Sequence, residues 1–219
     1  MGEPMRVAVV TGGHSFHVPG FHQLFRALDG VDAYIQHMHD FASARARVKE
    51  LYDVVVFYTM LKEGPADEGQ PWYTGKPLQT MQHWLDSGKG IVMLHHAILA
   101  YPDWQIWVDM VGLQAGSFED YRHGEVMKIS VADKTHPLTQ GLSDWEMIDE
   151  TYKMGEPDAN SHVLLTTDHP ACMKTIGWTR HVGKTRVFNL QSGHDNRTWE
   201  DIHFQKILTR GIQWAAGRI

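Results

Sequence analysis

The sequence contains one cysteine, Cys172, among its 219 residues. A single cysteine excludes an intrachain disulfide and a cysteine-rich metal centre. The 20 Lys and Arg residues are fewer than the 26 Asp and Glu residues and are scattered along the chain, so we expect no nucleic-acid partner, which would need a basic patch. No apolar run approaches the length of a membrane span, and the N-terminal residues lack a signal-peptide pattern. We therefore expect a cytoplasmic protein with no membrane partner.

What is present is typical of a folded globular chain, with 42% hydrophobic and 21% charged residues. The length suits one large domain with its own core. Because no linker-like segment separates the two halves, we predict a single domain over residues 1–219.

The first half alternates predicted strands and helices. Apolar runs predict strands at Arg6–Thr11, Val31–Gln36, Asp53–Tyr58 and Gly90–Leu94. Helical spacing predicts helices from Phe21 up to Gly30, over Phe41–Leu51, and from Pro77 to the residue before Gly88. This order predicts an α/β fold with a doubly wound, mostly parallel sheet flanked by helices.

The second half is less regular and adds further strands. The predicted strands are Gly124–Val131, Trp145–Met154, His162–Thr167, Cys172–Trp178 and Thr185–Leu190. Helices are predicted at Tyr101–Val111 and Trp199–Ala216, the second with an apolar face of Phe204, Ile207, Leu208, Gly211 and Ala215. The position of Cys172 inside an apolar strand predicts a buried, inert thiol.

Histidines follow the ends of three predicted strands. His14 and His17 follow the first strand, His95 and His96 follow the strand that ends in the middle of the chain, and His194 follows the last one. Ligands of open α/β sheets bind beyond the carboxyl ends of the strands, so we expect these imidazoles to converge on one pocket. Neighbours in a strand point to opposite faces. The pattern leaves open which histidine of each pair enters the pocket.

Carboxylates accompany these histidines at Asp149, Glu150 and Asp195. Imidazole and carboxylate together suit Zn²⁺, Mn²⁺ or Fe²⁺, and the same groups can act as acid and base without a metal. Glu150 is equally interpreted as a surface strand residue paired with Lys153.

Aromatic residues gather near the predicted strand-end loops, at Trp72, Tyr73, Tyr101, Trp104 and Trp107. Their faces could stack on sugar rings, although core packing is the commoner use of tryptophan. An exposed aromatic surface near Trp104 would suit the interface of a homo-oligomer.

Several pieces taken in order resemble the ThuA-like family, which is named for trehalose utilisation. The pieces are Val9–His14, Gly88–Ala97, His136–Leu142, Asp149–Tyr152, Gly183–Phe188 and Gly193–Asp195. The resemblance implies a fold similar to class I glutamine amidotransferases, a flavodoxin-like arrangement. It also implies that the turn at His95-His96-Ala97 is the place of the amidotransferase nucleophilic cysteine. With histidine there, amidotransferase chemistry is excluded.

The resemblance implies carbohydrate metabolism, often on keto-sugars, and it favours Glu150 and His194 as pocket residues. We expect an enzyme in which a divalent metal, zinc or manganese, is held by His14, His95, Glu150 and His194. The ion would polarise a sugar oxygen or activate water, and the expected proton carriers are His17, His96 and Asp195. Hydrolysis, elimination and isomerisation all remain open. The alternatives are acid–base chemistry without metal and a non-catalytic carbohydrate-binding or scaffold protein.

Overall fold

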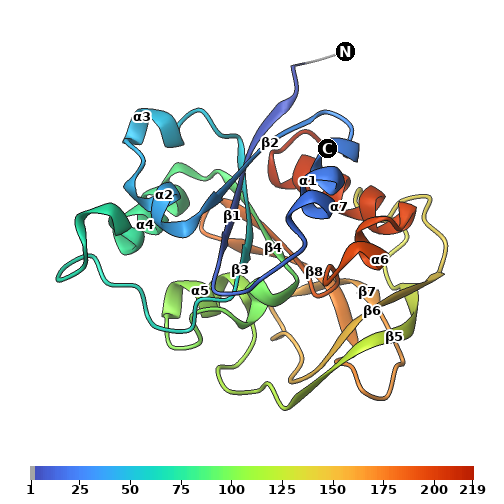
Figure 1. Ribbon diagram of the computed structural model, residues 1–219. Coiled ribbons are helices and arrows are strands. Elements are labelled where there is room, and N and C mark those ends of the chain that lie inside the picture. Colours follow the sequence, from blue (N-terminus) through green and yellow to red (C-terminus); the bar gives the residue numbers. More distant parts are fainter. Residues whose placement is uncertain (1–2) are drawn as a thin grey trace.

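A computed structural model describes residues 3–219. Met1 and Gly2, the first residues of the N-terminal segment that was examined for a signal peptide, lie outside the described residues. In residues 3–219 the strands form one nine-stranded sheet in the order β2-β1-β3-β4-β9-β8-β7-β5-β6 (Figure 1). The strands are β1 (Met5–Gly12), β2 (Val31–His37), β3 (Val54–Thr59), β4 (Gly90–Leu94), β5 (Asp120–Val131), β6 (Trp145–Lys153), β7 (His162–Thr166), β8 (Thr175–Val182) and β9 (Thr185–Leu190). The pairs from β2 to β9 in this order are parallel and the remaining pairs are antiparallel. The predicted fold class, including the extra strands of the second half, is confirmed.

Helices cover both faces of the parallel part of the sheet (Figure 1). α1 (Val18–Ala27) and α7 (Ile202–Ala215) pack on one face, whereas α2 (Met38–Ser43), α4 (Pro77–Ser87) and α5 (Gln105–Val111) pack on the other. Every residue of β3 and β4 is buried between these layers. This burial explains why both strands are continuous apolar runs in the sequence.

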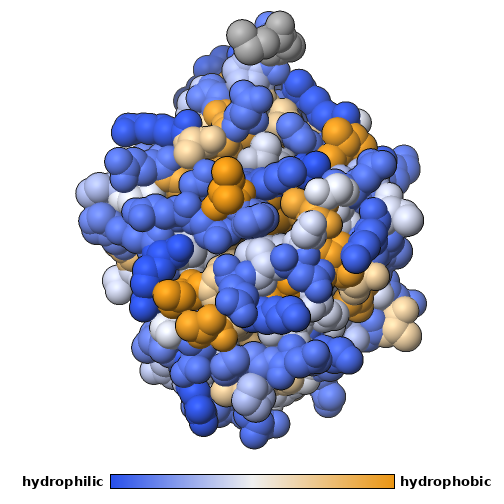
Figure 2. All heavy atoms as spheres, turned by 90° about the vertical axis from the view of Figure 1, so that its right-hand side faces the viewer, coloured by the Kyte–Doolittle hydropathy of each residue, from blue (hydrophilic) through white to orange (hydrophobic). Residues whose placement is uncertain are grey.

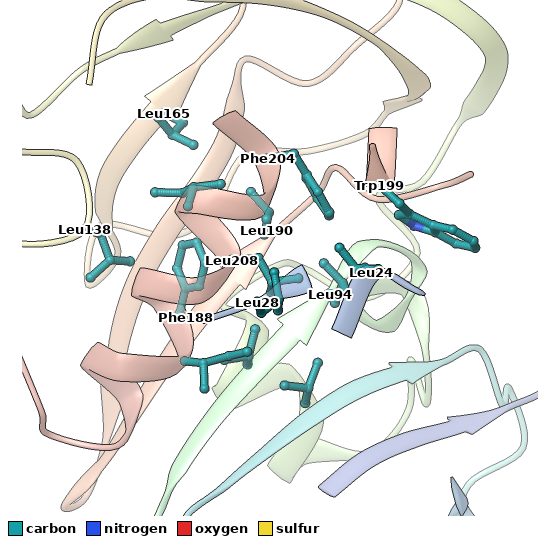
Figure 3. Packing of buried hydrophobic residues seen from close by; sticks show 14 of the residues in the cluster. Leu24, Leu28, Leu94, Leu138, Leu165, Phe188, Leu190, Trp199, Phe204 and Leu208 are labelled. Carbon is teal, nitrogen blue, oxygen red and sulfur yellow. The ribbon is translucent and has the colours of Figure 1, made fainter. Parts of the chain in front are cut away.

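The C-terminal helix α7 packs against β9 through its predicted apolar face. Phe204 and Leu208 lie on the side of α7 that faces Phe188 and Leu190 (Figure 3). The helix approaches the sheet closely at Gly211, where a Cβ atom would overlap the ring of Phe188. The predicted face is confirmed, because all its members are buried: Phe204, Ile207, Leu208, Gly211 and Ala215.

Residues 41–51 do not form the single helix that the sequence predicts. α2 ends at Ser43, and the short helix α3 (Ala46–Lys49) starts after an extended break. A continuous helix would use the carbonyl of Ala42 in its next turn. That carbonyl instead accepts a hydrogen bond from Thr80 Oγ1 of α4 at 3.3 Å. Lys49 Nζ also donates to this carbonyl at 3.3 Å, so two side chains bond to the acceptor that helix propagation would use.

The closing helix is also divided. Trp199 ends a short helix, α6 (Asn196–Trp199), and α7 begins at Ile202 rather than at Trp199 as predicted. The side chain of Asp201 accepts hydrogen bonds from two N–H groups of the first turn of α7. This N-cap fixes the start of α7.

The expected exposed aromatic surface near Trp104 is wrong. Trp104 is 8% exposed and packs against the rings of Tyr101 and Trp107. α5 begins at Gln105 rather than at Tyr101, whose φ of +42° is not helical. These rings complete the core on the α5 face of the sheet, so the aromatic surface on which a homo-oligomer was expected is not available.

Cys172 does not lie inside a strand as predicted. It precedes β8, in a turn where its N–H group donates to the carbonyl of His169 at 3.1 Å. The side chain is partly buried, and burial raises the pKa of the Cys172 thiol to about 12. The thiol therefore has little thiolate character in its true position too.

The surface on the side of α6 and α7 is mainly hydrophilic, with small hydrophobic groups between the polar residues (Figure 2). Within residues 3–219, every helix falls short of the length and apolar character that a membrane span requires.

Candidate functional site

His95 stands at the sharp turn that ends β4. Its φ is +54°, and a short 3₁₀ helix, η2 (His95–Leu99), starts at this residue. A positive φ is unfavourable for a residue with a side chain, so it persists only where the surrounding structure imposes it. A strand-to-helix turn of this kind presents its first side chain beyond the end of the strand. His95 is thereby placed at the carboxyl edge of the sheet, fully buried.

The hydrogen bonds of His95 determine which ring nitrogen carries its proton. Nδ1 lies 2.7 Å from the main-chain oxygen of Gln191. A carbonyl oxygen only accepts, so the Nδ1–H group donates this bond and the neutral ring has an unprotonated Nε2. Nε2 accepts a hydrogen bond from the Tyr152 hydroxyl at 2.8 Å. The unprotonated Nε2 of His95 thus faces the Tyr152 hydroxyl, Glu150 and His194 together.

Glu150 and His194 bring two more ligand atoms next to His95. Oε2 of Glu150 lies 3.0 Å from His95 Nε2 and 3.4 Å from His194 Nδ1. The two histidine nitrogens are 3.3 Å apart. We call these three residues the His–Glu–His cluster. Within residues 3–219, these are the His, Cys, Asp or Glu side chains that lie close enough together, in a group of at least three, to share a metal ion.

The charges of the cluster are coupled. Burial opposes ionisation of Glu150, but the hydrogen bond from His194 holds the pKa of Glu150 well below its ordinary value. The hydrogen bond to Glu150 raises the pKa of His194, although burial opposes this. Glu150 is therefore a carboxylate, and it favours the protonated form of His194.

Asp149 positions the loop that carries His194. Its Oδ2 accepts the N–H of Gly193 at 2.8 Å, and its Oδ1 accepts the N–H groups of His194 at 3.0 Å and of Glu150 at 2.8 Å. Asp149 is buried. The Tyr58 hydroxyl donates to the carbonyl of Gly193 at 3.2 Å. One buried carboxylate therefore fixes two members of the cluster relative to each other.

His123 is a site residue that the sequence analysis did not identify. Its Nδ1 lies 2.9 Å from Oε1 of Glu150, and its ring centre lies 4.7 Å from that of His194. It belongs to β5 at a bulge, next to Gly124 with a φ of +70°. A bulge redirects a strand side chain. The His-Gly pair was the available signal, but the predicted strand started one residue after His123.

His14 and His96 form a pair of rings beside the cluster, with centres 4.6 Å apart. His96 also packs on the ring of Tyr58 at 4.1 Å, and neither of its nitrogens has a hydrogen-bond partner in residues 3–219. Burial lowers the pKa of His96 to about 2 and also lowers the pKa of His14. The centre of the His14 ring lies 6.3 Å from that of the His194 ring. His14 is therefore not one of the three residues whose ligand atoms lie together.

His17 and Asp195 have other contacts. Nδ1 of His17, at the start of α1, lies 3.0 Å from Nδ2 and 3.1 Å from Oδ1 of the Asn196 side chain. Asp195 caps α6 through the N–H of Arg197 and pairs with the Arg197 guanidinium at 2.6 Å. The contact between His17 and Asn196 thus joins the loops after β1 and β9 near the cluster. Both His17 and Asp195 have local partners, Asn196 and Arg197.

The sheet order and the turn at His95 define the class of the protein as an α/β protein with the class I glutamine amidotransferase-like fold. A glutamine amidotransferase from Thermotoga maritima has this fold, with 10% identity and a TM-score of 0.56 over 97% of this chain and 98% of that one. Histidine rather than cysteine stands at the turn after β4, which is consistent with a protein that is not an amidotransferase.

The particular family follows from the sequence match. The ThuA family model, described as trehalose utilisation, matches residues 6–215, and the chain belongs to this family. ThuA-like proteins from Parabacteroides merdae and Bacteroides uniformis share the fold, with TM-scores of 0.77 and 0.74 at 20% and 18% identity. These matches cover 99% and 98% of this chain and 91% and 93% of the others. No curated protein matches the sequence. The family supports a sugar-related role.

Proposed function

We propose that this ThuA-family protein is a metal-dependent enzyme that acts on a sugar or keto-sugar derivative. The observation that carries the proposal is the spacing of the three ligand atoms in the His–Glu–His cluster, 3.0, 3.3 and 3.4 Å. Tetrahedral ligands about 2.0–2.1 Å from a zinc ion lie roughly 3.3–3.4 Å from one another. The observed triangle suits one face of such a tetrahedron. Catalytic zinc sites use three protein ligands, and manganese accepts the same donor types.

The surroundings of the cluster support this donor role. Metal-binding histidines usually donate their second ring N–H to a carbonyl or carboxylate, which fixes the ring and its tautomer. His95 does this with the carbonyl of Gln191. The loop of His194 is held by Asp149. Two of the three donors are therefore preorganised by the chain itself.

A divalent ion in the cluster would supply Lewis-acid activation of a carbonyl or hydroxyl oxygen of the sugar. Hydrolysis of the sugar, or elimination or isomerisation next to a carbonyl, fits that activation.

Proton transfer at this site is proposed for His123. Its side chain is 57% exposed and its ring lies over His194, so it reaches both solvent and a ligand at the cluster. Tyr152 has a different role, because burial raises its pKa well above the ordinary value, so its hydroxyl stays protonated beside His95. His96, with its lowered pKa, remains a neutral wall of the site.

The test is the metal content of protein purified without chelator or affinity tag. We expect about one zinc or manganese ion per chain, as one cluster can hold one ion. His95→Ala and Glu150→Gln should lose the ion, whereas His83→Ala, which replaces an exposed histidine on α4, should retain it. Protein that takes up neither metal would contradict the proposal.

Turnover is followed by NMR in D₂O on a panel of aldoses and keto-sugars, with and without EDTA. EDTA should abolish deuterium incorporation and product formation. Turnover that survives EDTA would indicate acid–base chemistry without metal, and sugar binding without turnover would indicate a binding protein.

A further inference from the structure

A cavity of about 330 Å³ lies at the end of the sheet opposite the His–Glu–His cluster. Its wall includes Arg186, the second residue of β9, whereas the cluster lies beyond the last residue of that strand, Leu190. At about 3.3 Å per residue, the strand rises roughly 13 Å between these two positions. Among the described residues, no member of the cluster lines the cavity. The cavity is therefore a separate feature from the proposed metal site.

The wall of the cavity is basic, although the chain as a whole has a net charge of −6. Within residues 3–219, its lining has no carboxylate, and its polar members are His136, Asn160, His162, Thr179, His181 and Arg186. Arg180 also lines the cavity, but its guanidinium bonds to the carbonyl of Asp109 on α5 and to Asp158. Three imidazoles, which can each take up a proton near neutral pH, and one unneutralised guanidinium thus surround the space.

Strand pairing places these side chains on one face of the sheet. His181 lies directly opposite Arg186 in the β8–β9 pair, and His162 lies directly opposite Thr179 in the β7–β8 pair. Directly opposite residues of an antiparallel pair share a face, and so do residues two apart in one strand. The face is the one that α7 covers, because the ring centre of His181 lies 5.7 Å from that of Trp214 on α7.

The guanidinium of Arg186 is held in place with one edge unpaired. Its Cζ atom lies 5.3 Å from the ring centre of Trp214, and its Nη1 donates to the main-chain oxygens of Trp214 at 3.0 Å and Ile219 at 3.3 Å. Nε and Nη2 have no hydrogen-bond partner in the part of the chain that the structure describes. These two N–H groups form an edge that binds two oxygens of one oxyanion side by side.

His136 offers a further donor, from the segment His136–Leu142 that the proposed function does not use. Its Nδ1 accepts a hydrogen bond from the N–H of Leu138 at 3.2 Å. Because a backbone N–H only donates, the neutral ring carries its proton on Nε2. The ring centre lies 5.4 Å from that of His162 and 5.7 Å from that of Trp214. His136 therefore points an N–H donor into the same group of rings that holds Arg186.

Thr179 supplies an independent sign of a ligand. The residue is only 4% exposed, yet its hydroxyl makes no hydrogen bond to any group in residues 3–219, and its oxygen is not fully enclosed. Buried polar groups are normally hydrogen-bonded, and leaving one unpaired is costly. Since Thr179 lines the cavity, a molecule bound there can supply the missing partner.

From these contacts we infer that the cavity binds a phosphate group, either inorganic phosphate or the phosphate of a small monoester. A phosphate group brings up to two negative charges and three strong acceptor oxygens. A wall with donors on several sides matches such a group better than a planar carboxylate, which has only two oxygens. The volume lies at the lower end of small-molecule sites, which leaves room for a small organic group beside the phosphate. The inference is independent of the proposed function.

The experiment measures binding of inorganic phosphate and glycerol 3-phosphate to the full chain by isothermal titration calorimetry at pH 7 in EDTA. Arg186→Gln should weaken phosphate binding at least about tenfold, because it removes a charge-assisted pair of hydrogen bonds. Thr179→Val should weaken it about fivefold. This second variant keeps the branched side chain that suits β8, so the test does not depend on the folding of Arg186→Gln. Tighter binding of glycerol 3-phosphate than of phosphate identifies an ester as the ligand, and weaker binding identifies the free ion.

Two controls separate this site from the rest of the molecule. Arg47→Gln removes an exposed arginine of α3, and His95→Ala alters the His–Glu–His cluster. Both should bind phosphate as the unaltered chain does, so failure of the metal site leaves this test intact. Acetate should bind at least about tenfold more weakly than phosphate. Lack of binding of both phosphate probes, unaltered phosphate binding by Arg186→Gln or Thr179→Val, weakened phosphate binding by either control, or equally tight binding of acetate would each overturn the inference.

Discussion

Replacing His96 with phenylalanine is expected to make the fold less sensitive to acid. Burial lowers the pKa of His96 from 6.5 to about 2. Below pH 6.5 the unfolded chain therefore binds a proton at this residue that the folded chain does not bind. The stability that depends on neutral His96 is present above pH 6.5 and is lost as the pH falls. Each pH unit in this range costs about 1.4 kcal/mol, so the step to pH 5 costs about 2 kcal/mol.

The assay is urea unfolding of the unaltered chain and His96→Phe at pH 7 and pH 5 in EDTA. Any steric cost of the larger ring is the same at both pH values, so it cancels in the comparison. The groups facing His96, which include His14, His95 and Glu150, are present in both proteins. His83→Phe controls for the loss of one exposed imidazole. Equal acid-induced losses of unfolding free energy in the unaltered chain and His96→Phe would refute the reasoning.

Three further predictions concern other parts of the molecule. Asp149→Asn should weaken zinc binding by about tenfold to a hundredfold. The reason is that one amide oxygen cannot accept all the N–H groups around His194 that the two carboxylate oxygens accept. Unchanged affinity in a zinc competition titration would contradict this prediction. Gly211→Ala should lower the unfolding free energy by about 1–3 kcal/mol, despite the better helix propensity of alanine, because its Cβ meets Phe188; a more stable variant in urea unfolding would show that α7 can shift. Burial raises the pKa of the Cys172 thiol to about 12. In the folded chain this thiol should therefore react with DTNB at least about a hundredfold more slowly than free cysteine. Rapid labelling of the folded chain would contradict the burial of Cys172.

The parallel strands were predictable because burial on both faces leaves continuous apolar runs. The predicted bounds of Gly90–Leu94 and Thr185–Leu190 agree with β4 and β9. The break between α2 and α3 was not predictable, because the carbonyl of Ala42 is bonded to side chains that the periodic pattern does not place there, Thr80 of a distant helix and Lys49. The division between α6 and α7 had a local signal in Asp201, a favourable N-cap residue.

In the candidate site, too, the residues that parallel strands position were predictable and those that depend on local irregularities were not. His95 and His194 lie close together because β4 and β9 are parallel neighbours whose carboxyl ends meet. Strand-end logic brings histidines of the parallel strands together. It does not apply to His123, which comes from an antiparallel strand and is aimed at Glu150 by a bulge. The partners of His17 also depend on loop packing that no periodic pattern encodes.

The most direct test of the central claim is a crystal structure of the zinc-loaded chain with anomalous diffraction data recorded at the zinc edge. The account predicts one strong anomalous peak about 2.0–2.2 Å from His95 Nε2, Glu150 Oε2 and His194 Nδ1. A peak elsewhere, or a zinc-soaked crystal in which these three atoms remain bonded only to one another, would contradict it.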